Sequence, residues 1–151
     1  MKFLRKFPVE RYGKNEKDRQ DFYEKLILAS IIEREAVLDR EKPVIASVFY
    51  NRIKKGMRLG SDATVNYIFG YEKRRIYYKD LKIESPYNTY RNHGLPPAPI
   101  GNPGIKAIEA SMNPASTEYY FFVATYDETN SHHFTKTYKE HINYQKQNKP
   151  K

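Results

Sequence analysis

The chain has 151 residues, of which 39% are hydrophobic and 30% charged, and its formal net charge is +9. This length suits one compact domain, and the 15% of aromatic residues supply bulky apolar surface, which argues against a disordered chain. The absence of cysteine excludes disulfides and thiolate chemistry, and no apolar run approaches the roughly 20 residues of a membrane-spanning helix.

The first predicted element is a helix that follows a charged segment. Residues 1–19 are expected to be a linker or the edge of a missing N-terminal region, and residues 20–147 the folded domain. A helical stripe recurs every three to four positions at Phe22, Leu26, Ala29, Glu33 and Val37. Because apolar residues also occupy its other sides, this helix is expected to be central and buried nearly all round.

Two further helices are predicted before a long loop. Pro43 suits the first position of a helix that Gly56 ends. Ser61 or Asp62 can cap a short helix that closes at Gly70. Residues 84–104 are rich in proline and glycine, which predicts a long, stiff loop that forms a cleft wall.

The C-terminal third is predicted to hold a helix and a hairpin. Asn102 and Pro103 resemble the cap and first residue of a helix that ends at Met112. Residues 119–126 predict a buried strand and residues 133–136 its return strand.

A final helix is expected after the hairpin. Thr137 and Glu140 match a capping box, so this helix should run to about Gln147, before a tail at residues 148–151. Together these elements predict an α+β fold, with a buried central helix, further helices and a small antiparallel sheet.

Two glutamates close the predicted central helix, Glu33 and Glu35. Small Ala29 and Ser30 lie one turn before Glu33 and leave room for a ligand. Apolar surroundings raise the pKa of a carboxyl group, which favours proton donation near neutral pH. Spacing alone does not separate the two glutamates, and it favours a surface ion pair over catalysis.

Six blocks of the sequence, in this order, resemble the motifs of one known family. They are residues 29–35 (ASIIERE), 46–52 (ASVFYNR), 57–65 (MRLGSDATV), 85–90 (SPYNTY), 94–104 (GLPPAPIGNPG) and 120–124 (YFFVA) with 133–135 (HFT). The family that they resemble is that of the endolytic murein transglycosylases, also called YceG-like or MltG. Six ordered blocks are far more specific than one short motif.

This resemblance implies cleavage between N-acetylmuramic acid and N-acetylglucosamine in peptidoglycan, with a 1,6-anhydro sugar as the new end. It places the catalytic glutamate at Glu33, acting as acid and then as base. Ordinary glycoside hydrolases need a second carboxylate, and none is expected across the cleft. Glu35 and Asp62 are interpreted as structural or substrate-orienting.

The predicted substrate-binding residues offer flat rings, amides and hydroxyls to a sugar. They are Tyr87, Asn88, Thr89, Tyr90, Ser61, Asp62, Asn102 and His133. Asn88 ranks first because an amide can bind an acetamido group or steady Glu33. A packed aromatic turn is the alternative interpretation of residues 87–90.

No metal or cofactor is expected. His132 and His133 are adjacent, so on a strand they point to opposite faces, and no third ligand lies at a familiar spacing. The basic and aromatic run at residues 71–79 could bind nucleic acid. It is more typical of a solvated face, or of a contact with anionic polymer or lipid headgroups, so no nucleic acid partner is expected.

The resemblance also implies a cellular setting. Peptidoglycan glycan strands are the expected partner, together with cell-wall synthases, at the extracytoplasmic face of the bacterial membrane (the periplasm or cell-wall space). The role would be to terminate nascent strands during wall assembly. The family carries an N-terminal membrane helix and a small glycan-binding domain, so this chain is expected to be a fragment or a shortened relative. The alternative is a non-catalytic peptidoglycan-binding module or an inactive fragment.

Overall fold

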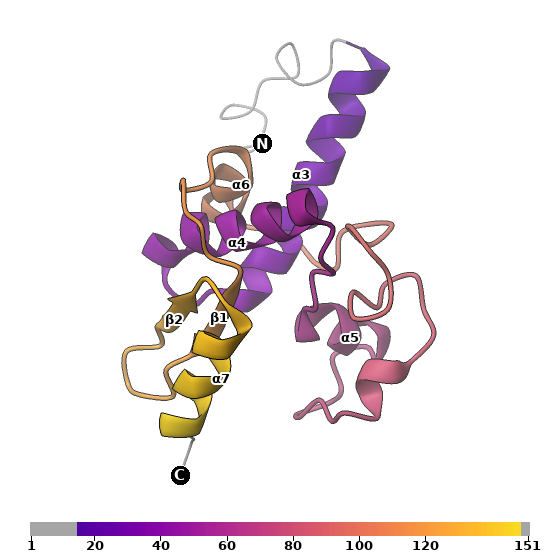
Figure 1. The fold of residues 1–151 in the computed structure, drawn as a ribbon. Coiled ribbons are helices and arrows are strands. Elements are labelled where there is room, and N and C mark those ends of the chain that lie inside the picture. Colours follow the sequence, from indigo (N-terminus) through magenta and orange to yellow (C-terminus); the bar gives the residue numbers. More distant parts are fainter. Residues whose placement is uncertain (1–14, 149–151) are drawn as a thin grey trace.

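The computed structural model describes residues 15–148, and its helices and strands confirm the predicted α+β class (Figure 1). In chain order the elements are α3 (Glu16–Glu35), the 3-10 turn η1 (Asp39–Glu41), α4 (Lys42–Lys55), α5 (Asp62–Ile68), the 3-10 turn η2 (Asp80–Lys82), α6 (Ile105–Met112), β1 (Phe121–Ala124), β2 (His132–Thr135) and α7 (Tyr138–Gln147). Most of the predicted linker and tail lies outside the described residues. Within the described range, no helix is both long and apolar enough to cross a membrane.

Helix α3 is the central element of the fold. It begins at Glu16, slightly earlier than predicted, because the Asn15 side chain accepts a hydrogen bond from the Asp18 N–H. The first half projects beyond the other elements (Figure 1). The six consecutive residues Ile27–Ile32 are buried, which confirms the predicted all-round burial for this stretch, whereas Arg34 in the last turn is exposed. Val37, from the predicted stripe, lies beyond the helix and is exposed.

The core forms where α3, α4 and α6 pack against one another. Its largest fully buried side chains include Leu28, Ile31, Ile45 and Phe49. Each such side chain contributes about 1.5–3 kcal/mol to folding through its removal from water. This core fixes the C-terminal end of α3, which is the part of the helix that carries the two glutamates.

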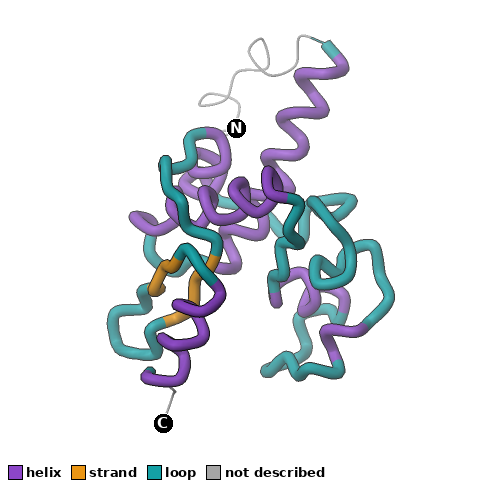
Figure 2. The backbone as a smooth tube through the Cα atoms, in the orientation of Figure 1, coloured by secondary structure: helices purple, strands orange, loops and turns teal. Residues whose placement is uncertain are grey.

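Helices α4 and α5 begin much as predicted. Pro43 lies in the first turn of α4, and Gly56 ends that helix with a φ of 75°, in the left-handed region that glycine adopts without strain. Ser61 precedes α5 in an extended conformation, but its hydroxyl does not cap the helix. It donates to Glu35 instead. Figure 2 shows α5 and its loops on one side of the molecule, and the sheet with α7 on the other.

The proline-rich segment at residues 84–104 contains neither helix nor strand. It is tied to α3 through the Ile100 N–H, which donates to the Ser30 hydroxyl at 3.0 Å. The prediction that Asn102 caps the next helix is wrong, because α6 begins after Gly104. The backbone N–H of Gly104 instead donates to the carboxylate of Glu33, on another helix.

The sheet is a two-stranded antiparallel hairpin. In its register Phe121 pairs with Thr135 and Val123 with His133. The strand predicted at residues 119–126 is shorter, and it is half-buried because α4 and α7 cover it only in part. Helix α7 is capped by Thr137, whose hydroxyl accepts from the Glu140 N–H at 3.2 Å.

Candidate active site

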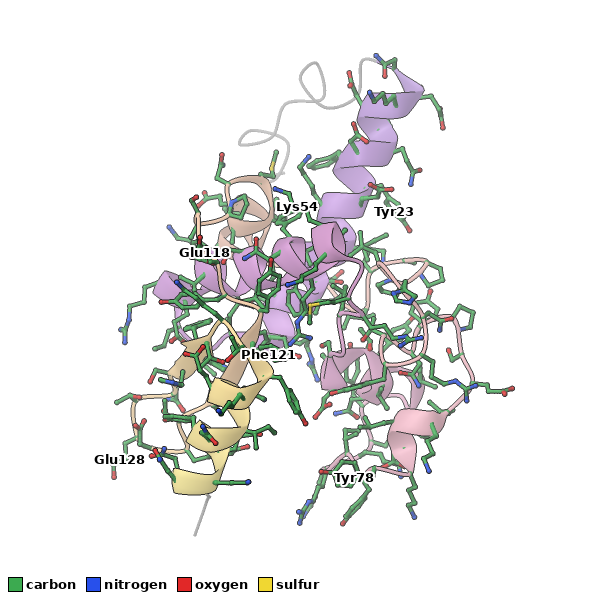
Figure 3. The ribbon with its side chains drawn as sticks, in the orientation of Figure 1. Tyr23, Lys54, Tyr78, Glu118, Phe121 and Glu128 are labelled. Carbon is green, nitrogen blue, oxygen red and sulfur yellow. The ribbon has the colours of Figure 1, made fainter. Side chains whose placement is uncertain are left out.

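A pocket of about 500 Å³ opens between α5 on one side and β1 with α7 on the other. Its volume falls in the range of small-ligand sites. Its floor and one wall come from Glu35, Arg52, Asp62, Tyr90 and the segment at residues 58–61. The facing wall comes from β1 and α7, and Phe121 of this wall is labelled in Figure 3, between the α3–α4 pair and α7.

Glu35 is the last residue of α3, and its carboxyl group reaches this pocket. The Ser61 hydroxyl donates to Glu35 Oε1 at 2.6 Å. The protein packed around the carboxyl group raises the pKa of Glu35 by removing water, and the negative charge of Asp62 raises it further. The hydrogen bond from Ser61 and the charge of His132 lower this pKa by less. Glu35 therefore holds its proton to a higher pH than an exposed glutamate.

Asp62 and Tyr90 form the second polar part of the pocket. The Tyr90 hydroxyl donates a hydrogen bond to Asp62 Oδ1. Burial raises the pKa of Tyr90, and the bond to Asp62 raises it further, so the hydroxyl stays protonated as a donor. These two predicted residues do lie together in the pocket, next to Ser61.

Arg52 holds the rim of the pocket in place. Its guanidinium donates to the Tyr120 carbonyl at 2.7 Å and to the Leu59 carbonyl at 2.6 Å. These bonds join α4 to the segment before α5 and to the start of β1. The cation also lies over the Phe121 ring, at 5.2 Å from its centroid.

Glu33 lies in different surroundings from Glu35. Residues two positions apart on a helix point in nearly opposite directions, and Glu33 does not line the pocket. Its Oε1 accepts from the Gly104 N–H at 2.7 Å, and its Oε2 lies 3.8 Å from Lys42 Nζ. A Cβ at residue 104 would lie 2.6 Å from Oε1, so glycine lets the two groups meet. A backbone donor and a nearby cation are typical partners of a carboxyl group that fixes a helix start.

The predicted sugar-binding residues at 87–89 hold their own loop together. Asn88 is fully buried, and its amide donates to the Leu81 carbonyl at 2.9 Å and the Ile83 carbonyl at 2.8 Å. Thr89 is also buried, and its hydroxyl accepts from the Ser61 N–H at 2.9 Å. The Tyr87 ring packs against Tyr67, at 4.9 Å between centroids. None of the three lines the pocket.

Asn102 and His133 also lie outside the pocket. Asn102 is exposed. The His133 ring stacks on Tyr144 of α7 at 3.8 Å, whereas His132 bonds to Glu41, so the two histidines face opposite ways as predicted. In the part of the chain that the structure describes, no three His, Asp or Glu side chains converge as metal ligands.

The pocket contains residues that were not predicted from the sequence. The main ones are Arg52, Phe121, Tyr138 and His141. Tyr138 and His141 lie three positions apart on α7, so they share one face, and the His141 ring stacks on Phe121 at 5.2 Å. The three-residue spacing of Tyr138 and His141 on a predicted helix was the sequence signal that could have placed them on one face.

Comparison with known proteins identifies relatives of the whole described fold. The YceG-like family profile matches residues 2–147. The chain is 47% identical over 134 residues to the endolytic murein transglycosylase of Bacillus subtilis (strain 168), covering 88% of this chain and 37% of that protein. It is 34% identical over 131 residues to the protein of the same name from Streptococcus pneumoniae serotype 2 (strain D39 / NCTC 7466), covering 80% of this chain and 24% of that protein. The chain thus spans well under half of these relatives.

A solved structure agrees with the sequence matches. The fold superposes on the crystal structure of a YceG-like protein from Listeria monocytogenes with a TM-score of 0.80 and 43% identity, covering 93% of this chain and 44% of that one. The resemblance predicted from the six sequence blocks is confirmed by these matches. The chain belongs to the YceG-like family.

Proposed function

We propose that this chain is an endolytic lytic transglycosylase that cleaves peptidoglycan glycan strands. The observation that carries the proposal is Glu35, a carboxyl group with a raised pKa in a pocket lined by rings and hydroxyls. The names of the Bacillus and Streptococcus relatives support the same activity. The substrate is then the bond between N-acetylmuramic acid and N-acetylglucosamine.

The chemistry needs one group that first gives and then takes a proton. Protonated Glu35 donates to the glycosidic oxygen as the bond to C1 of the muramic sugar breaks. The C6 hydroxyl of that sugar attacks C1, and its proton passes to the Glu35 carboxylate. The new end is a 1,6-anhydro sugar, Glu35 is protonated again, and no water is consumed.

The geometry favours Glu35 over Glu33 for this role. The family resemblance implies Glu33 as the catalytic residue, and this stays a prediction. The Glu33 carboxylate, however, accepts a hydrogen bond from the Gly104 N–H and lies near Lys42. Glu35 also accepts hydrogen bonds, from the Ser61 hydroxyl and the Ala63 backbone, but its burial keeps its pKa raised and its carboxyl group lines the pocket. Mutation of each glutamate separately distinguishes the two.

Asp62 is a second carboxylate in the same pocket, although none was expected there. We assign it an orienting role, because its oxygen holds the Tyr90 hydroxyl and its charge raises the pKa of Glu35. Phe121 and Tyr138 supply flat faces for the sugar rings. A hydrolase that used Asp62 as nucleophile or base would give different products.

Replacing Asp62 with asparagine should shift the pH dependence of the reaction. The substitution removes the negative charge that raises the pKa of Glu35 but keeps an oxygen for the Tyr90 hydroxyl. Activity requires protonated Glu35, so the rate falls as pH rises through this pKa. The alkaline limb of the pH profile, where kcat/KM falls as pH rises, is therefore expected at lower pH in Asp62→Asn than in the wild type. An unmoved limb, or one moved to higher pH, would show that Asp62 does not tune Glu35.

Product analysis in ¹⁸O-labelled water tests the proposed function. Uncrosslinked glycan strands are incubated with the protein, and the released fragments are weighed by mass spectrometry. A lytic transglycosylase gives anhydro ends that carry no label. Fragments heavier by one labelled water would mark a hydrolase, and binding without any fragments would mark a non-catalytic module.

The proposed activity also gives the chain a setting. Its substrate lies in the cell wall, so we place its action at the extracytoplasmic face of the membrane, where nascent strands are terminated. Cell-wall synthases are the partners that produce such strands.

A further inference from the structure

A histidine of α7 belongs to the pocket wall that lies opposite Glu35. His141 lines the pocket together with Tyr138, which lies three positions earlier on the same helix. The His141 ring stacks on Phe121 of β1, at 5.2 Å between centroids and 27° between the ring planes. Tyr138 contacts the same Phe121 ring at 5.8 Å. These contacts fix the imidazole on the aromatic side of the pocket, where α7 packs against β1 (Figure 1).

The two nitrogens of the His141 ring have different surroundings. Nδ1 is buried, and no residue within the described range 15–148 forms a hydrogen bond with it. Nε2 is not one of the buried, unpaired atoms, and the structure gives it no bond to another described residue. Because the ring lines the pocket, Nε2 is the nitrogen that a molecule bound there can reach.

The surroundings also keep the His141 ring neutral at pH 7. Burial lowers the pKa of His141, the charge of the Arg52 guanidinium lowers it further, and His133 acts in the same direction. A charged imidazolium has two N–H groups, and the one on Nδ1 would be buried without an acceptor. The ring therefore carries a single proton.

This single proton is expected on Nε2. In folded proteins a buried N–H without an acceptor is rarer than a buried acceptor without a donor. With the lone pair on Nδ1 and the proton on Nε2, His141 offers the pocket one uncharged hydrogen-bond donor. Such a donor suits a neutral oxygen, such as an amide carbonyl, whereas a carboxylate or phosphate is better held by a cation.

The wall around His141 is otherwise mostly apolar. Residues 121–123 of β1 line it with two phenylalanine rings and a valine, whereas Asp62 and Tyr90 lie on the other side of the pocket. An N-acetyl group combines a methyl group, which packs on apolar surface, with a carbonyl oxygen, which accepts one hydrogen bond. One donor set among apolar side chains matches this combination.

We propose that His141 binds the N-acetyl group of a sugar in the pocket, with Nε2–H donating to the carbonyl oxygen and the methyl group packing against residues 121–123. The proposal rests on the proposed function, in which both sugars at the cleaved bond carry N-acetyl groups, and it names the part of the substrate that this wall recognises. A de-N-acetylated sugar has an amine in place of the amide and offers no carbonyl oxygen to Nε2. The pocket should therefore select acetylated strands.

Cleavage of acetylated and chemically de-N-acetylated glycan strands tests this selection. In His141→Phe, which keeps an aromatic ring on Phe121 but has no donor, kcat/KM for acetylated strands is expected to fall about three- to tenfold, the usual effect of one hydrogen bond. The value for de-N-acetylated strands should change little, so the preference shrinks by the same factor. Because the substrate amine carries the same charge in both assays, comparing the preferences of variant and wild type isolates the donor.

Two further variants control for packing. His141→Gln places an amide N–H near the position of Nε2 and should keep most of the preference. His133→Phe changes a histidine that stacks on Tyr144 outside the pocket, and it should match the wild type. Thermal unfolding establishes that each variant is folded. An unchanged preference in His141→Phe, or an equal loss in His141→Gln and His141→Phe, would overturn the proposal.

Nitrogen-15 NMR of the His141 ring separates this proposal from the proposed function. The probes are the trimers of N-acetylglucosamine and of glucosamine, which lack the muramic sugar and are not cleaved. The free ring should carry its proton on Nε2 at pH 7, and only the acetylated trimer should shift the Nε2 resonance. A charged ring, a proton on Nδ1, or a shift with neither or with both trimers would contradict the proposal. If the wild type cleaves no strands, the proposed function fails, and the trimers still show whether His141 binds an N-acetyl group.

Discussion

Replacing Glu35 with glutamine is expected to lower kcat for strand cleavage about 10²–10⁴-fold, the usual contribution of a general acid and base. An amide has the size of the carboxyl group and can accept the Ser61 hydroxyl bond, but it cannot give a proton to the glycosidic oxygen. The measurement is the rate at which anhydro-ended fragments appear from uncrosslinked strands. Circular dichroism and thermal unfolding establish that the variant is folded.

Glu33→Gln is the matched control, two positions earlier on the same helix. It is expected to retain most of the activity, since Glu33 lies outside the pocket. It should instead lower the free energy of unfolding by about 1–2 kcal/mol, because the charged acceptor of the Gly104 N–H becomes neutral. If Glu33→Gln is inactive while Glu35→Gln cleaves normally, the acid is Glu33 and the assignment to Glu35 is wrong.

Replacing Asn88 with alanine is expected to destabilise the fold by about 3 kcal/mol or more. The substitution leaves two backbone carbonyls and the Tyr90 N–H without their partner, and each unpaired group in a buried place costs about 1–3 kcal/mol. Urea unfolding measures the effect as a lowered midpoint at an unchanged slope.

Asn102→Ala is the control for Asn88, because Asn102 is an exposed asparagine of the same proline-rich region. Its free energy of unfolding should stay within about 0.5 kcal/mol of the wild type. If Asn88→Ala is as stable as this control but binds glycan strands poorly, Asn88 contacts the sugar and its structural role is refuted.

Local signals in the sequence predicted much of the fold. Pro43 and Gly56 delimit α4, and Thr137 caps α7, because such signals act within one helical turn. The start of α6 could not be predicted, since its partner Glu33 lies 71 residues away in the chain. The length of β1 likewise depends on how α4 and α7 cover it.

The site was predictable only in part. Glu33 and Glu35 both end an apolar helix, and the pattern does not show which one faces a pocket whose other side comes from Asp62 and Tyr90. Asn88 has the chemistry of a sugar-binding amide, but the same amide also satisfies backbone carbonyls. The ordered motifs predicted the family correctly, because they extend over most of the chain.

The pH at which Glu35 titrates is the most direct measure of its proposed role. Carbon-13 NMR of glutamate carboxyl groups in the folded protein follows it residue by residue. The pKa of Glu35 is expected above the ordinary value of 4.5, and the rate of strand cleavage should fall through the same pH. A Glu35 that ionises at 4.5 or below would contradict its assignment as the proton donor.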